Sequence, residues 1–165
     1  MKKIFLFATL ALLIFASCKK SGSAITTNNT ITASVDGVVY NCNVEPASET
    51  YIDSSGTNAW YSYDTWVSDS NHNGFYLYIA KLNKTITNGT YGVQGDSTTR
   101  AYIEYDSTSG WWGSATVLSP ATITITSSGG GNVQGTFQGT VYKYEDSTSA
   151  DKKVITNGKF NITAL

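Results

Sequence analysis

Apolar and polar residues alternate at every second position along most of this chain, and this pattern limits its fold more than any other feature. Ala121–Thr126 alternates strictly, and Phe75–Leu82 places Phe, Leu and Ile on one side and Tyr on the other. Period-two alternation is typical of β-strands with one buried face. No window of eleven residues carries an apolar stripe at helical spacing. The sequence therefore predicts an all-β domain.

Turn residues divide the alternating segments into short strands. Asp36-Gly37 separates Ile31–Val35 from Val38–Val44, and Asp-Gly is a favoured hairpin turn. Strands at a spacing of about 8–12 residues are typical of sandwiches and barrels. Because the segments differ in length, we expect an antiparallel β-sandwich of about 8–10 short strands, with a barrel as the alternative.

Two segments of the chain are nearly the same. Ile86–Tyr91 and Ile155–Phe160 each contain Ile-Thr-Asn-Gly, with an aromatic residue two positions after the glycine. We expect each Asn-Gly pair to form a turn with positive φ that starts a strand. Tyr91 and Phe160 should then enter the core.

The first residues have the organisation of an export signal. Basic Met1–Lys3 precedes the apolar run Ile4–Ala16, which is shorter than the roughly 20 residues of a membrane-spanning helix. Residues 19–30 are small and polar, which is typical of a flexible tether. We therefore expect a signal peptide over 1–17, the N-terminus and tether over 18–30, and one β-sandwich domain over 31–165.

Ala16-Ser17-Cys18 directly follows the apolar run and resembles a bacterial lipobox. The resemblance implies cleavage before Cys18 and attachment of lipid to its sulfur and new amino group. The membrane would then be a partner through the lipid anchor. The alternative is an ordinary signal peptide followed by a chance cysteine.

Three further segments resemble an uncharacterised family of Bacteroidota lipoproteins that have a single all-β domain. They are Thr32–Gly37, Gly135–Gly139 and Val154–Asn161. The resemblance implies a lipid-anchored outer-membrane protein and supplies no activity. Lys19 and Lys20 stand where surface-exported members carry acidic residues, which favours the periplasmic side over the cell surface.

Composition argues against several classes of function. Eleven basic residues against twelve acidic ones give no basic face for nucleic acid. His72 is the single histidine, and no Gly-x-Ser-x-Gly motif surrounds a serine. Asp64 and Glu104 are the only acids well inside strand-like segments, and glycoside hydrolysis would need two such acids in one cleft. We expect no enzyme and no cofactor.

The segment Asp69–Gly74 matches the first half of a calcium-binding loop. The position of the closing bidentate Glu is occupied by Ala80, and a polar hairpin loop explains the same residues, so we assign no metal. His72 is expected to be an exposed loop residue. Cys42 shares one strand face with Val38, Tyr40 and Val44, and we expect a buried structural thiol.

Aromatic residues are the strongest candidates for ligand binding. Adjacent Trp111 and Trp112 should point to opposite faces of a strand. Exposed aromatic rings can stack on sugar rings and are frequent at binding hot spots. The alternative is cross-strand packing on the outside of the sheet. The candidate binding residues are Trp60, Trp66, Trp111 and Trp112.

The tripeptide Asp-Ser-Thr occurs three times and resembles the O-glycosylation motif of exported Bacteroidota proteins. The resemblance implies glycan on Ser97, Ser107 and Ser147, which all fall in expected loops. Asp-Ser is also a common turn start.

Together these features predict a lipid-anchored, non-enzymatic protein of the cell envelope that binds a glycan or another ligand through its aromatic residues. The alternative is a structural or assembly-linked envelope protein with no small-molecule ligand, whose partner is another envelope protein.

Overall fold

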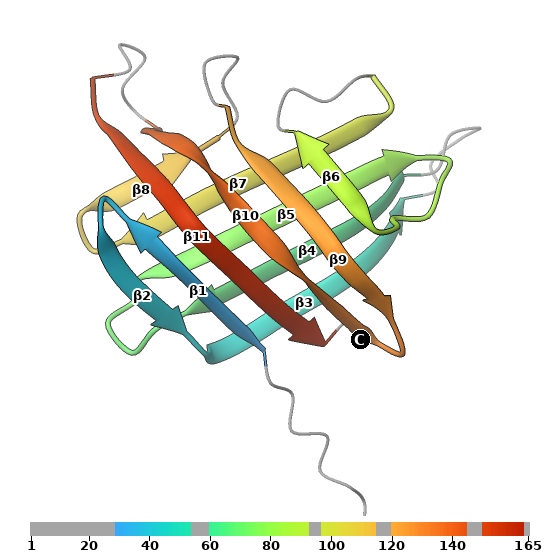
Figure 1. The fold of residues 1–165 in the computed structure, drawn as a ribbon, viewed down its shortest axis with the longest axis horizontal. Helices are drawn as coiled ribbons and strands as arrows, with labels where there is room; N and C mark the ends of the chain where they lie inside the picture. Colours follow the sequence, from blue (N-terminus) through green and yellow to red (C-terminus); the bar gives the residue numbers. More distant parts are fainter. Residues whose placement is uncertain (1–28, 54–59, 93–96, 115–119, 145–149, 164–165) are drawn as a thin grey trace, which may run out of the picture.

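The computed structural model describes residues 29–53, 60–92, 97–114, 120–144 and 150–163 (Figure 1). Every regular element in these ranges is a β-strand, which confirms the all-β class. There are eleven strands, slightly more than the 8–10 expected. They are β1 (Thr30–Val35), β2 (Val38–Cys42), β3 (Val44–Asp53), β4 (Trp60–Ser68), β5 (Gly74–Leu82), β6 (Gly89–Gly92), β7 (Thr99–Ser107), β8 (Gly110–Gly113), β9 (Thr122–Gly129), β10 (Asn132–Lys143) and β11 (Lys152–Thr163).

The strands form one antiparallel sheet that curls back over itself. Its order is β2-β1-β11-β10-β8-β7-β5-β4-β3, and β9 pairs with both β10 and β6. Figure 1 shows β1, β11, β10 and β9 crossing in front of β7, β5, β4 and β3. The arrangement is therefore a half-closed barrel with two layers. It combines features of the expected sandwich and of its barrel alternative.

Two corners join the layers. The first part of β10 pairs with β9, whereas Tyr142 and Lys143 at its end pair with Gly113 and Trp112 of β8. At the other corner the chain passes from β2 into β3 through Asn43, whose N–H donates to the Ser68 carbonyl at 3.1 Å. Strands that switch from one layer to the other in this way form the corners of orthogonally packed sheets.

The core lies between the layers and takes the inward residues of both. Phe75 of β5 and Phe137 of β10 meet there, with ring centroids 5.5 Å apart. Burying side chains of this size contributes about 1.5–3 kcal/mol each. Fully buried core residues also include Ile31, Val67, Ile103, Ile123, Ile125, Val141 and Ile155.

The two similar segments differ in structure. Gly89 has a φ of 152° and begins β6, as expected. The expected turn at Asn157-Gly158 is wrong, because β11 continues through it as one strand. Asn157 has a φ of 54° and forms a bulge where the pairing with β10 shifts. Tyr91 and Phe160 are both buried, which confirms that part of the prediction.

Candidate functional site: an outward aromatic face

The layer formed by β4, β5, β7 and β8 is aromatic on its outer side. Inward positions of these strands, such as Val67, Phe75 and Ile103, are buried, so the alternate positions point outward. Strand pairing places these outward residues beside one another. We call the following set the aromatic face: Trp60, Asp64, Trp66, Tyr76, Tyr78, Tyr102, Glu104, Asp106, Trp111 and the adjoining Tyr144.

Trp111 and Trp112 point to opposite sides of β8, as predicted. Trp112 is only 2% exposed, and its Nε1–H donates to the Asp151 carboxylate at 3.1 Å. Its ring lies 5.8 Å from that of Tyr105. The prediction that Trp112 binds a ligand is therefore wrong, because its side chain is part of the core. Trp111 is 59% exposed.

Trp60 and Trp66 share the outer side with Trp111 but are half-buried. The Arg100 guanidinium covers the Trp60 ring at 4.3 Å from its centroid. Trp66 lies over Gly74, where an added Cβ would come within 2.8 Å of the indole. Both rings are engaged by neighbours, which leaves Trp111 as the most accessible of the four tryptophans.

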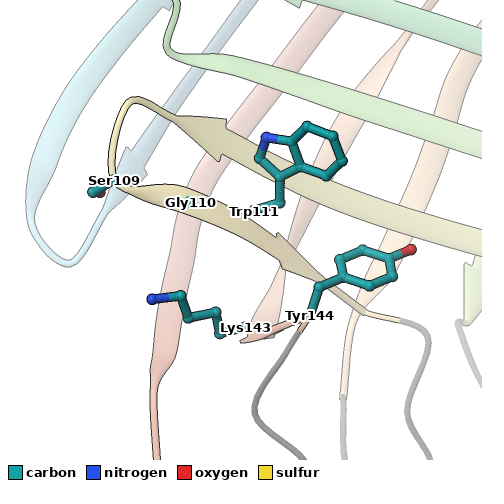
Figure 2. A pocket seen from close by; sticks show the side chains of 5 residues that line it. All are labelled: Ser109, Gly110, Trp111, Lys143 and Tyr144. Carbon is teal, nitrogen blue, oxygen red and sulfur yellow. The ribbon is translucent and has the colours of Figure 1, made fainter.

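A hollow of about 400 Å³ lies beside Trp111. It is lined by Ser109, Gly110, Trp111, Lys143 and Tyr144 (Figure 2). The Tyr144 N–H donates to the Trp111 carbonyl at 3.1 Å, and the Tyr144 side chain is 58% exposed. Figure 2 shows the rings of Trp111 and Tyr144 near each other, with Lys143 extending away from both. The hollow thus offers two exposed aromatic rings to a ligand.

Hydrogen bonds with other residues of the aromatic face hold the Tyr144 side chain in place. The hydroxyl oxygens of Tyr102 and Tyr144 are 2.6 Å apart, and the Tyr102 hydroxyl donates to Glu104 at 2.9 Å. Tyr144 can then donate to Tyr102. An added Cβ at Gly113 would overlap with the Tyr102 hydroxyl. The absence of a side chain at Gly113 therefore leaves room for the Tyr102 side chain to lie across β8.

The protonation states suit hydrogen bonding to a polar ligand. Burial, together with the Tyr144 and Glu104 contacts, raises the pKa of Tyr102, so its hydroxyl remains a donor. Burial also raises the pKa of Tyr76, whose hydroxyl donates to Asp64 at 2.9 Å. Desolvation and the nearby Asp106 raise the pKa of Glu104, against the opposing effect of its bond from Tyr102.

The structure supports the interpretation of Asp69–Gly74 as a hairpin loop. The Asp69 carboxylate accepts the backbone N–H groups of Asn71 and Asn73 at 2.8 and 2.9 Å, and the Asn73 amide as well. The Asp69 carboxylate is therefore hydrogen-bonded within its own loop, as in an Asx-type turn. Within the described residues there is no cluster of three His, Cys, Asp or Glu. His72 is exposed in this loop, as expected.

Cys42 is a buried thiol, as predicted. It is 1% exposed, and its Sγ donates to the Asn73 carbonyl at 3.4 Å. Desolvation, helped by the charge of Asp69, raises its pKa to about 12. A thiol with so high a pKa is a poor nucleophile at neutral pH. Cys42 thus connects β2 to the β4–β5 hairpin.

The expected modification sites differ in position. Ser97 is exposed in a turn. The expected loop position of Ser107 is wrong, because Ser107 ends β7, is half-buried and shares a 2.8 Å hydrogen bond with Ser109. Ser147 and Cys18 lie outside the described residues. Glycosylation stays a prediction, and the intact mass of the protein from its native host would test it.

Comparison of the chain with protein-family models, with curated proteins and with solved structures gave no match. In the described part of the chain, no helix has the length and apolar character needed to span a bilayer.

Sequence reasoning found Trp111 but missed Tyr144. The alternation that begins at Val141 was the available signal, because in an extended chain it places Tyr142 and Tyr144 on the same side.

Proposed function

We propose that this protein is a lipid-anchored lipoprotein of the cell envelope whose β domain binds a glycan at the hollow beside Trp111. One observation carries the binding part of the proposal. Trp111 and Tyr144 expose aromatic rings at a hollow of about 400 Å³, within a face that also holds phenol donors and carboxylate acceptors.

The chemistry of the hollow fits a sugar better than a purely apolar ligand. A pyranose has apolar C–H groups on its ring faces and hydroxyls around its edge. Trp111 offers a flat surface for the ring face, and Tyr144 places a hydroxyl at the edge. Small-molecule sites commonly combine aromatic walls with a few polar groups in volumes of roughly 300–1,000 Å³.

The anchoring part of the proposal rests on the sequence alone. Lipid on Cys18 would hold the domain at the outer membrane, on the periplasmic side, through residues 19–30. Each buried methylene of an acyl chain contributes about 0.8 kcal/mol, so several chains make a lasting anchor. Metabolic labelling with palmitate in a bacterial host tests this. The wild-type chain should take up label and Cys18→Ser should not. Equal labelling of both would contradict the anchor.

The structural alternative is favoured by a different observation. Trp60 lies beneath Arg100 and Trp66 lies over Gly74, so these two rings stabilise the outer side of the sheet. A cation–π contact of this kind contributes about 0.5–1 kcal/mol at exposed sites. If no ligand occupies the hollow, the aromatic face would serve only packing, and the protein would be a structural or assembly-linked envelope component.

Tryptophan fluorescence of the purified protein against a panel of soluble glycans separates the two functions. We expect a saturable change with at least one glycan, and its loss in Trp111→Ala. Val39→Ala is the matched control, because it truncates an exposed apolar side chain on β2 that does not line the hollow. A flat response across the panel from folded protein would contradict glycan binding.

A further inference from the structure

We propose that the hollow beside Trp111 selects uncharged pyranosides and discriminates against glycans that carry carboxylate or sulfate groups. This inference rests on the proposed glycan binding and adds the charge class of the ligand. It follows from which side chains stand next to Trp111.

Asp106 is the direct cross-strand neighbour of Trp111. The two residues form a register pair between β7 and β8, and both point outward. Cβ atoms of such pairs lie about 4.5–5.5 Å apart. A sugar ring stacked on Trp111 therefore has its edge hydroxyls next to the Asp106 carboxylate, which can accept charge-assisted hydrogen bonds from them.

A second carboxylate continues the same acidic edge. Glu104 is paired with Gly113, one outward position further along β7 and β8, and it accepts from Tyr102. Desolvation and the repulsion from Asp106 raise the pKa of Glu104. Desolvation raises the pKa of Asp106, against the opposing effects of its bond from the Ser107 backbone and of the nearby His72. An anionic sugar at Trp111 would add a third negative charge to this edge.

The one cationic side chain lining the hollow is directed elsewhere. Lys143 is paired with Asp151 at 3.5 Å, and its Nζ lies 5.8 Å from the centroid of the buried Trp112 ring. Figure 2 shows it extending away from Trp111 and Tyr144. Arg100 stacks on Trp60 at the other end of the aromatic face. Among the described residues, neither cation forms an ion pair with Asp106 or Glu104.

Binding of neutral and acidic oligosaccharides of equal length tests the inference. The neutral probes are hexasaccharides of β-1,4-linked glucose, mannose and N-acetylglucosamine, and the acidic probe is hexagalacturonate. Tryptophan fluorescence, with Trp111→Ala as the reference, reports Kd at about 20 mM and about 500 mM salt. At low salt, we expect the Kd of at least one neutral probe to be lower than that of hexagalacturonate by a factor of about ten or more. The ratio should shrink at high salt because screening weakens the repulsion.

Asp106→Asn separates charge from stacking. We expect this substitution to raise the Kd of the neutral probe about five- to tenfold, because a charge-assisted hydrogen bond is lost. The ratio between the Kd of hexagalacturonate and that of the neutral probe should become smaller. Asp64→Asn is the matched control, because this carboxylate lies on the same face beside Tyr76 and away from the hollow, so its effect should be smaller.

The outcomes distinguish the two proposals. Binding that requires Trp111 but favours hexagalacturonate, or does not distinguish it from the neutral probes, would overturn the charge selection and leave glycan binding intact. Binding of no probe, with folded protein, would overturn both. An Asp106→Asn variant with unchanged Kd for every probe would remove Asp106 from the site.

Discussion

The two sides of strand β8 carry adjacent tryptophans with opposite roles. On the inner side, Trp112 is 2% exposed, bonds to Asp151 and packs on Tyr105. On the outer side, Trp111 is 59% exposed and borders a hollow with Tyr144. The same residue type therefore stabilises the core on one side of the sheet and presents a free ring on the other.

The difference shows that aromatic content alone does not measure a binding surface. Rings on the inner side exclude water from the core. Of the outer rings, Trp60 and Trp66 are engaged by Arg100 and Gly74, and Tyr102 by hydrogen bonds. Among the outer rings that the structure describes, Trp111 and Tyr144 are exposed and border a hollow. The following substitutions test this division between the two sides.

Trp112→Ala should have the largest effect on stability. Removing a buried Trp from a packed core costs about 3–5 kcal/mol of unfolding free energy. Trp111→Ala is the matched control on the other side, and it should change stability by no more than about 0.5 kcal/mol. Urea denaturation followed by circular dichroism measures both. Equal losses for the two variants would contradict the assignment of inner and outer roles.

Gly113→Ala should destabilise the outer side by about 1–3 kcal/mol, because overpacking displaces neighbouring atoms. The new Cβ would overlap with Tyr102 and approach Tyr144. Gly92→Ala is the control, since nothing lies within 4 Å of a Cβ there. The same urea titration reports both variants. A Gly113→Ala variant as stable as the wild type would contradict the requirement for a glycine next to the Tyr102 hydroxyl.

Tyr102→Phe removes the hydroxyl that joins Glu104 and Tyr144. A hydrogen bond of this kind contributes about 0.5–1.5 kcal/mol, so we expect a loss in that range, together with weaker glycan binding because Tyr144 is no longer held. Tyr78→Phe is the comparison on the same face. Chemical denaturation and a glycan titration are the measurements. Unchanged binding in Tyr102→Phe would remove the Tyr102 hydroxyl from the support of the site.

Glu104→Gln should have the smallest effect and one that depends on pH. Because the folded pKa of Glu104 is raised, its protonated form stabilises the fold below its unfolded pKa, near 4.3. That contribution is lost as pH rises through the folded pKa. At pH 7 Glu104→Gln should therefore be more stable than wild type, by less than about 1 kcal/mol because the group is half-exposed.

Stability curves between pH 3 and 8 measure this difference, which should vanish or reverse in acid. A Glu104→Gln variant that is less stable than wild type at pH 7 would indicate that the bond from Tyr102 outweighs desolvation.

Much of the fold could be predicted because period-two alternation is a local signal. It located most of the strands, although it missed β3 and extended β2 to Val44, and it placed Trp111 and Trp112 on opposite sides. It could not tell which of the two points inward, since that depends on how β8 is paired with β7 and β10. Tyr144 escaped prediction because it meets Trp111 only through the pairing of β10 with β8. Asn157-Gly158 looked like a turn because a bulge uses the same residues.

The most direct test of the site is the response of the tryptophan indole N–H signals to a glycan. Two-dimensional NMR of the ¹⁵N-labelled protein should show four indole signals, assigned by substitution of each tryptophan. With the tightest-binding neutral hexasaccharide, we predict a saturable shift of the Trp111 signal, while that of Trp112, bonded to Asp151 in the core, stays in place. A Trp111 signal that does not move while glycan binds elsewhere on the protein would contradict the assignment of this hollow as the site.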